Sequence, residues 1–100
     1  MKINELVLKL IKNTKEDKIE WTSPSKASYR YLTDTGAVTI TNHSNQYFEI
    51  RLYDIDTCFA TYQTMVDPEL DRLSKELYMA ITDSLNREIE RKIETIFDSL

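Results

Sequence analysis

Residues 67–100 read DPELDRLSKELYMAITDSLNREIERKIETIFDSL, and this stretch decides the architecture of the chain. Asp67-Pro68-Glu69 is typical of a helix start, with a proline in the first turn. Apolar residues then recur every three or four positions, which is the repeat of one helical face. These residues are Leu70, Leu73, Leu77, Ile81, Leu85, Ile89, Ile93, Ile96 and Leu100.

The length of this predicted helix has a consequence for assembly. At about 1.5 Å per residue, a continuous helix from Pro68 would be on the order of 48 Å long, whereas a compact domain of this size has a radius of gyration of about 13 Å. Either the helix breaks near residues 82–86, or residues 86–100 protrude and bury their apolar side chains against another copy or another protein. We favour a homodimer, because charged residues flank the apolar positions as they do in helix pairs. The predicted seam consists of Leu85, Ile89, Ile93, Ile96, Phe97 and Leu100.

The segment before this helix predicts one helix and a series of strands. Residues 4–17 are expected to form a helix capped by Asn4, with Ile3 and Leu8 at the spacing of a hydrophobic staple. Short segments rich in aromatic and β-branched residues follow, and turn residues separate them. The predicted strands are residues 19–22, 28–33, 37–41, 46–53 and 57–65.

Two turn residues and one alternating segment refine this prediction. Pro24 is expected to end the first strand, and Gly36, the only glycine, is expected to supply the positive φ of a tight hairpin. In residues 46–53, Phe48, Ile50 and Leu52 alternate with polar residues, which is typical of a half-buried antiparallel strand. The sequence therefore predicts a single α+β domain over residues 1–100. It consists of an N-terminal helix, an antiparallel β-meander of four to five strands and a long C-terminal helix, with both helices on one sheet face.

Composition limits the possible partners and the compartment. The chain has 100 residues, 41% of them hydrophobic, and a net charge of −4. All of the acidic excess lies in residues 67–100, where nine acidic residues face five basic ones, so direct nucleic-acid binding is not expected. A lone cysteine, Cys58, favours a reducing compartment. Because the apolar segment at residues 6–11 is too short to span a membrane, we expect a cytoplasmic protein without a membrane partner.

Candidate groups for catalysis are few. The chain has one histidine, His43, and one cysteine, Cys58, and neither a catalytic dyad nor a zinc site is expected from them. Asp54-Ile55-Asp56 resembles the opening of a calcium loop, but Phe59 and Met65 replace the required glycine and glutamate. A hairpin turn is the better interpretation. We therefore expect no enzyme activity, no catalytic residues, no bound metal and no cofactor.

A recognition surface is predicted on the sheet face that the helices leave uncovered. Tyr47, Arg51 and Tyr53 share that face by alternation, and Tyr with Arg is enriched at recognition surfaces. Tyr29, Tyr31 or Tyr62 could join them, although tyrosine is also ordinary in half-exposed strands. A second charged feature is the lysine edge of the first helix, which is either solvated or paired with an acidic partner. It consists of Lys9, Lys12, Lys15 and Lys18.

One short motif carries a family resemblance. Thr14-Lys15, followed by Ile19-Glu20-Trp21 and tyrosine-rich strands, resembles small uncharacterised α+β proteins of bacteria and their prophages. Those proteins show a helix, a Thr-Lys segment, a strand ending in Trp, a β-meander and a C-terminal helix. This chain departs from them in its Asp-Ile-Asp turn, where a glycine is usual, and in its longer last helix. The resemblance implies a bacterial or phage setting and no catalytic residues.

These observations predict a small non-enzymatic binding protein that acts through protein–protein interaction. The sharpest version is an inhibitor of a host defence or nucleic-acid enzyme, in which Glu88, Glu90 and Glu94 compete for a basic groove. One alternative is a protein that sequesters a small ligand or nucleotide at a subunit interface, with lysine or arginine on phosphate and tyrosine stacked on a base. Another alternative is a structural dimer or adaptor.

Overall fold

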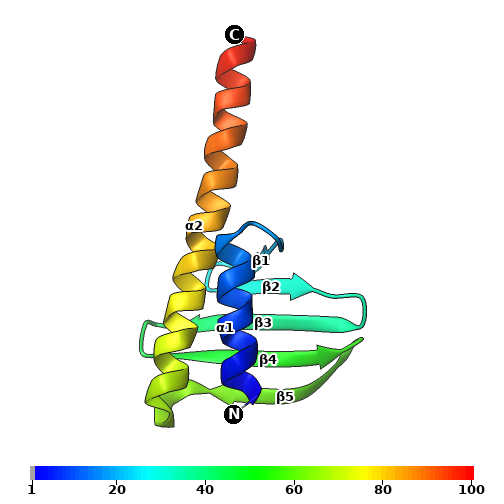
Figure 1. The fold of residues 1–100 in the computed structure, drawn as a ribbon, viewed down its shortest axis with the longest axis vertical. Helices are drawn as coiled ribbons and strands as arrows, with labels where there is room; N and C mark the ends of the chain where they lie inside the picture. Colours follow the sequence, from blue (N-terminus) through cyan, green and yellow to red (C-terminus); the bar gives the residue numbers. More distant parts are fainter. Residues whose placement is uncertain (1) are drawn as a thin grey trace.

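Five antiparallel strands and two helices make up the fold in the computed structural model, which describes residues 2–100. The strands form one sheet in sequence order, and both helices lie on the same face of it (Figure 1). The predicted α+β class is confirmed. The elements are α1 (Lys2–Lys15), β1 (Thr22–Ser25), β2 (Ser28–Leu32), β3 (Gly36–His43), β4 (Tyr47–Asp54), β5 (Thr57–Gln63), a 3-10 turn η1 (Thr64–Val66) and α2 (Pro68–Ser99).

The core lies between the helices and the sheet. The first half of α2 supplies its most buried side chains, and the apolar face of β4 meets them as the alternation of Phe48, Ile50 and Leu52 predicts. Phe48 and Ile50 are buried, while Leu52 is partly buried at the edge of the core. The other buried apolar residues are Ile3, Val7, Leu10, Ile11, Trp21, Val38, Ile40, Leu70, Leu73, Leu77, Ala80 and Ile81.

The predicted bounds of α1 are wrong at both ends. The helix begins at Lys2, so Asn4 lies inside the first turn, and its side-chain oxygen is buried without a hydrogen-bond partner. The predicted cap and staple are therefore wrong as well. The earlier start places Ile3 within the helix, and its side chain is buried in the core. The helix ends at Lys15, and Asp17 leaves it with a left-handed φ of 56°.

Trp21 fixes the segment that follows α1. Its indole N–H donates a 2.9 Å hydrogen bond to Oγ1 of Thr14, whose hydroxyl donates in turn to the carbonyl of Leu10 at 2.7 Å. The Trp21 ring also packs against Tyr31 with a centroid separation of 5.7 Å. Trp21 is thus part of the core, and it lies just before the first strand, which begins at Thr22. The predicted strand at residues 19–22 is therefore wrong.

The observed first strand contains the proline that was expected to end it. β1 runs over Thr22–Ser25 and includes Pro24. It pairs only with β2, and the register shifts between Thr22 and Ser25. An edge strand tolerates proline because one of its sides needs no N–H donors, and a bulge relaxes the ladder further. Pro24 therefore protects this edge of the sheet against pairing with another strand.

Gly36 is required for a different reason from the predicted one. No glycine in the described chain has a positive φ, and Gly36 is the first residue of β3. A Cβ atom built on Gly36 would lie 1.9 Å from the carbonyl oxygen of Tyr53 in β4. The position therefore needs glycine because the two backbones approach each other closely, and the positive-φ prediction is wrong.

Left-handed residues do occur in two other hairpins: Ser44 and Asn45 between β3 and β4, and Ile55 between β4 and β5. The Asp54-Ile55-Asp56 segment forms the predicted turn, with Ile55 at a φ of 55° and its N–H bonded to the carbonyl of Thr35 at 2.9 Å. Left-handed backbone costs an L-residue roughly 1–2 kcal/mol, and a β-branched residue is especially strained there.

Ile55→Gly is expected to stabilise the protein by about 1 kcal/mol, because relief of strain exceeds the extra entropy of glycine in the unfolded chain. The Ile55 side chain is 75% exposed, so little apolar burial is lost. The free energy of urea-induced unfolding measures the effect. Ile55→Ala is the control, since it removes the branch but keeps the Cβ and should give a smaller gain. A destabilised glycine variant would show that the isoleucine side chain makes a contact worth more than the strain.

The transition from β5 into α2 is tighter than the sequence suggests. β5 ends at Gln63 instead of Met65, and η1 turns the chain. Oγ1 of Thr64 accepts the Phe48 N–H at 2.9 Å and donates to the Asp71 carboxylate. The predicted start of α2 is confirmed, because the helix begins at Pro68. The Asp67 carboxylate caps it by accepting the Leu70 N–H at 3.1 Å.

α2 is a single unbroken helix of 32 residues, so the predicted alternative of a break near residues 82–86 is wrong. Within that region the Thr82 hydroxyl bonds the Tyr78 carbonyl at 3.0 Å and the Tyr29 hydroxyl at 2.9 Å. The molecule is accordingly 51 Å long, with a radius of gyration of 14.6 Å. Neither helix in the described part of the chain is long and apolar enough to cross a membrane.

Candidate interaction surfaces

The C-terminal part of α2 projects beyond the rest of the fold (Figure 1). Every residue from 86 to 100 is exposed, and we call these residues the projecting end. Its large apolar side chains are more than half exposed, and we call them the apolar stripe. The stripe consists of Ile89 (53% exposed), Ile93 (51%), Ile96 (63%), Phe97 (76%) and Leu100 (100%).

The predicted seam residue Leu85 has a different environment. It is partly buried against the core, whereas the rest of the predicted seam is exposed. Residues on either side of Leu85 bond Asp17. Arg87 Nη2 lies 3.0 Å from Oδ1 of Asp17, and the Ser84 hydroxyl donates to the same oxygen at 3.2 Å. The hydrogen bond from Arg87, with a smaller contribution from Ser84, lowers the pKa of the Asp17 carboxyl. The loop after α1 therefore ties α2 to the body of the protein up to Arg87.

The apolar stripe continues the side of α2 that faces the sheet. Tyr78 packs against Tyr29 with ring centroids 4.9 Å apart, Thr82 bonds the hydroxyl of Tyr29, and Leu85 lies against the core. Steps of three and four lead from these positions to Ile89, Ile93, Ile96 and Leu100, which therefore share that side of the helix. The stripe thus lies on the sheet-facing side of α2, but it extends past the edge strand β1 and has no sheet to pack against.

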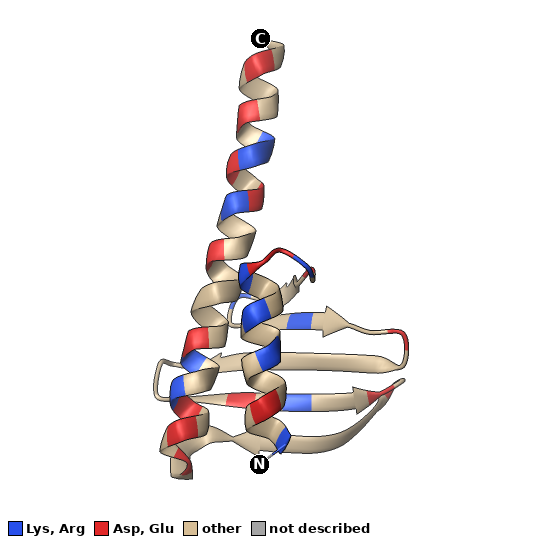
Figure 2. Cartoon of the chain, in the orientation of Figure 1, with Lys and Arg blue, Asp and Glu red and all other residues tan. Residues whose placement is uncertain are grey.

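Charges of both signs surround the stripe on the projecting end, as Figure 2 shows. Lys92 and Glu88 pair at 3.3 Å, one helical turn apart. The three acidic residues expected to compete for a basic groove, Glu88, Glu90 and Glu94, are all exposed. The stripe itself contains no charged residue.

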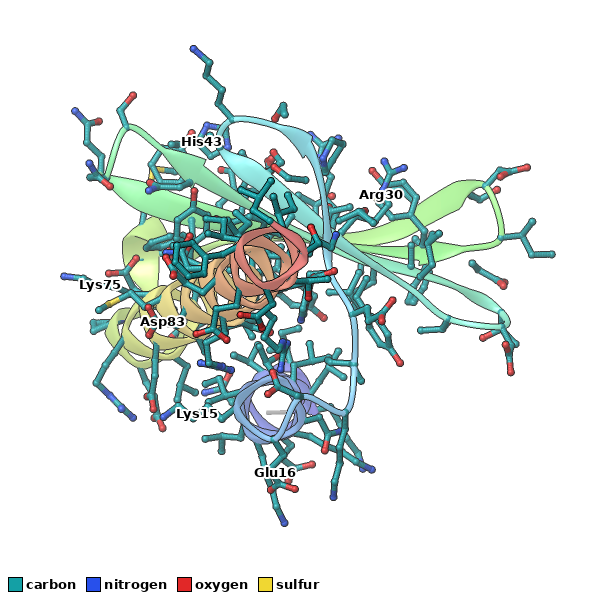
Figure 3. All side chains as sticks on the ribbon, turned by 90° about the horizontal axis from the view of Figure 1, so that it is seen from above. Lys15, Glu16, Arg30, His43, Lys75 and Asp83 are labelled. Atoms are coloured by element: carbon teal, nitrogen blue, oxygen red, sulfur yellow. The ribbon has the colours of Figure 1, made fainter. Side chains whose placement is uncertain are left out.

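The second candidate surface is the face of the sheet that the helices leave uncovered, and we call it the open face. The strand register aligns Arg30, Thr39 and Arg51 across β2, β3 and β4, and it aligns Thr41, Glu49 and Gln63 in the next row. Figure 3 shows Arg30 and His43 on the side of the sheet turned away from α1. Alternation along β4 places the predicted residues Tyr47, Arg51 and Tyr53 on this same face.

The other tyrosines considered for this face lie elsewhere. Tyr29, Tyr31 and Tyr62 are partly buried against the core on the helix-covered face, so the prediction that they could join the recognition surface is wrong. One face of the Tyr47 ring is covered, because it stacks on the ring of His43 with centroids 4.6 Å apart.

Glu49 is the feature of the open face that sequence reasoning missed. Alternation assigns it to the uncovered face, yet it is only 7% exposed. Arg51 Nε lies 3.3 Å from its carboxylate, the Gln63 amide donates to it at 3.3 Å, and His43 Nε2 is 3.5 Å away. Burial by itself raises the pKa of Glu49, but the hydrogen bond from Gln63 and the charge of Arg51 outweigh it, so the pKa is lowered overall.

Glu49→Gln is expected to lower the free energy of unfolding by about 1–2 kcal/mol at pH 7, because hydrogen bonds to a charged group are lost. A lowered folded-state pKa means that the carboxylate stabilises the fold above pH 4.5, its unfolded value, and that this contribution disappears as the pH falls below it. The difference between variant and wild type should therefore shrink at pH 3. Unfolding curves at both pH values measure it.

Asp17→Asn is the matched control for Glu49→Gln. The pKa of Asp17 is lowered too, but its ion pair with Arg87 is solvent-exposed, so the substitution should change stability little. Asparagine also tolerates the left-handed backbone of position 17. A pH-independent cost for Glu49→Gln would mean that packing, and not charge, sets the contribution of Glu49.

A shallow depression of about 310 Å³ lies on the open face above these rows. Arg30 borders it from β2 and Arg51 from β4, and Glu49 and Tyr53 line it on either side of Arg51 along β4. Arg30 forms no ion pair with any residue that the structure describes. The remaining lining residues are Pro24, Ser25, Ser28, Thr39 and Thr41.

The residues considered for catalysis or metal binding lie apart. His43 is at the end of β3 that pairs with Tyr47, whereas Cys58 pairs with Tyr53 at the opposite end of β4. Within residues 2–100, no three of the His, Cys, Asp and Glu side chains are grouped as metal ligands. Two lysines of the predicted edge form ion pairs within the chain: Lys15 lies 3.4 Å from Glu76 of α2, and Lys18, which follows α1, lies 2.8 Å from Glu16.

Comparisons of the chain with known protein families, with curated proteins and with solved structures found no match. Function is therefore inferred from the projecting end of α2 and from the open face of the sheet.

Proposed function

We propose that the protein is a non-enzymatic binding protein that acts by protein–protein contact, and that the projecting end of α2 makes this contact with a second copy of the chain. The observation that carries the proposal is the apolar stripe, which is exposed along one side of a helix that has left its own core. Monomeric soluble proteins rarely expose contiguous apolar patches of this kind, and such patches usually mark interaction sites.

The gain available from burying the stripe is sufficient for association. Full burial of an isoleucine, leucine or phenylalanine side chain is worth about 1.5–3 kcal/mol. Five partly buried side chains from each of two copies therefore supply on the order of 15 kcal/mol, against an association cost of about 4–15 kcal/mol. A surplus of about 4–8 kcal/mol corresponds to a dissociation constant in the millimolar to micromolar range.

The helical state of the projecting end also favours a partner. Isolated helices of fewer than about 12–15 residues are marginal in water, because nucleation is costly and tertiary packing normally supplies the stability. The projecting end has 15 residues, from 86 to 100, and none of them is buried. A second helix packed against the stripe would supply the missing contacts.

The experiment that tests the proposal is sedimentation velocity over a range from low micromolar to millimolar protein. The chain has a mass of 11.8 kDa, and we expect the average mass to rise toward twice this value as the concentration increases. A mass that stays at one chain throughout the range would contradict the proposal, because the stripe would then be stable in water.

A second function, binding of an anionic ligand, is supported by the open face of the sheet. Arg30 and Arg51 are two strands apart, roughly 10 Å at the backbone, and both border the same depression. Arginine pairs with phosphate and carboxylate groups through two parallel hydrogen bonds, and Tyr53 at the border could stack on a base. The ligand class that fits is a small phosphate-bearing molecule, with a nucleotide as the example.

Thermal unfolding with inorganic phosphate and a set of nucleotides tests this second function. A ligand that binds only the folded state should raise the Tm, and the increase should grow with the logarithm of the ligand concentration once this exceeds the Kd. Arg30→Gln should abolish the increase. Lys26→Gln is the control, because it removes an exposed positive charge outside the depression. No increase with any member of the set would remove the support for ligand binding.

A further inference from the structure

The side of α2 on which the stripe lies determines how two copies can pair, and this inference rests on the proposed function. Ile89, Ile93, Ile96 and Leu100 follow each other in steps of four, three and four, which is the spacing of core positions in a two-helix coiled coil. Phe97 widens the stripe at its far end. Two such helices could pair in parallel or antiparallel orientation.

A parallel pair would force the two sheets into the same space. The stripe continues the line of Tyr78, Thr82 and Leu85, and this line faces the sheet of its own chain. In a parallel pair the same residue levels of both helices face each other. The sheet-facing sides of both copies would then be opposed, and both sheets would have to lie between the two helices.

An antiparallel pair avoids this collision. With Ile93 of each copy level with Ile96 of the other, Leu100 of one helix lies opposite Ile89 of its partner. The partner helix then ends about one turn beyond Leu85, the last residue of α2 that packs against the core. Each sheet lies beyond the tip of the other helix, so the two bodies occupy opposite ends of the pair.

The neighbouring edge of the sheet favours a helix over a strand as the occupant. β1 is the edge strand, it contains Pro24, and its ladder is shifted between Thr22 and Ser25. Such an edge is a poor template for an additional strand. The surface left beside it is the apolar stripe, which a helix with complementary spacing can cover.

We infer that two copies of the chain pair antiparallel through the apolar stripe, with Leu100 of each copy opposite Ile89 of the other. The resulting dimer is elongated, with one α+β body at each end and a two-helix connector in the middle. The open faces with Arg30 and Arg51 remain uncovered in both copies, because the contact involves only the projecting ends.

Disulfide trapping tests the orientation. Ile89→Cys and Leu100→Cys are made separately in a Cys58→Ser background, because the native Cys58 is an exposed free thiol. One variant is labelled with ¹⁵N, the two are mixed and oxidised, and mass spectrometry separates mixed from matched disulfides. In the antiparallel pair, matched cysteines are about 16 Å apart along the axis, which is too far for a disulfide.

The antiparallel arrangement predicts a mixed disulfide between the two variants and no matched disulfide in either variant alone. Matched disulfides, with a dimer by sedimentation, would establish a parallel pair and overturn the inference while leaving the proposed function in place. A dimer without any disulfide would also overturn it, because the contact would then lie elsewhere. A monomer would overturn both the inference and the proposed function.

Discussion

Replacement of both Ile93 and Ile96 by aspartate is expected to convert the protein into a monomer at all accessible concentrations. The two residues lie in the middle of the apolar stripe and are 51% and 63% exposed. Each substitution removes about 1.5–3 kcal/mol of possible apolar burial and places a charge where the partner offers only apolar side chains. A loss of about 4 kcal/mol corresponds to roughly a thousandfold weaker association. Sedimentation velocity measures this change.

Two controls separate loss of the contact from other effects of the double substitution. Thr95→Asp with Ser99→Asp adds the same charge to exposed positions outside the stripe and should leave association nearly unchanged. Far-ultraviolet circular dichroism at low concentration should give the same helix content for both double variants. If the Thr95 and Ser99 variant also became monomeric, net charge would be the cause, and the stripe would not be the interface.

The effect of the same variants on any cellular partner would show whether assembly is needed for function. If self-association serves only to display the two open faces, a monomer should bind an anionic ligand with unchanged affinity per site but lose avidity for a surface with several sites. If another protein occupies the stripe, both self-association and that binding should be lost together. The two surfaces can therefore be tested independently, because they share no residue.

Residues 67–100 show how far the sequence alone could predict the fold. The helix start at Asp67-Pro68-Glu69 and the helical repeat depend on neighbours in sequence, and both predictions are confirmed. The break near residues 82–86 could not be excluded in that way. The Thr82 hydroxyl in this region bonds the Tyr29 hydroxyl, and because the two residues are 53 positions apart, this contact cannot be predicted from neighbours in sequence.

The open face shows a second limit of sequence reasoning. Alternation along β4 correctly predicts which side chains point to which face, since the period of a strand is two. It could not predict that Glu49 is buried there. The burial depends on Gln63 in β5 and on Arg51 beside it, and the alignment of β4 with β5 includes a register shift between Leu52 and Tyr53.

Local rules also fail at the start of α1 and at β1, in each case because of a distant contact. Asn4 is a good capping residue, but the helix begins at Lys2 and buries Ile3 in the core. Pro24 is a good strand breaker, but the position of β1 at the edge of the sheet removes the need for its missing donor. Propensity is therefore a weak guide where tertiary packing decides the outcome.

Gly36→Ala is expected to lower the free energy of unfolding by about 3 kcal/mol, at the upper end of the usual cost of overpacking. The added Cβ would lie 1.9 Å from the carbonyl oxygen of Tyr53 and 3.3 Å from Cα of Asp54. Both neighbours are backbone atoms of β4, so they cannot move aside as a flexible side chain would. The start of β3 would have to separate from β4, at the point where Thr35 accepts the Ile55 N–H. Urea-induced unfolding, with an unchanged dependence on denaturant, measures the loss.

Gly36→Asn distinguishes this close approach from the requirement for a positive φ that the sequence suggests. Asparagine tolerates left-handed backbone better than alanine, so a positive-φ position would make the asparagine variant the more stable of the two. With the φ of Gly36 in the ordinary range, asparagine carries the same Cβ and a larger side chain, and it should cost at least as much as alanine. Ala37→Gly, one residue along β3, should cost only about 1 kcal/mol or less, because it removes a Cβ without creating a clash. An asparagine variant more stable than the alanine variant would mean that backbone conformation, and not the distance to Tyr53, selects glycine at the start of β3.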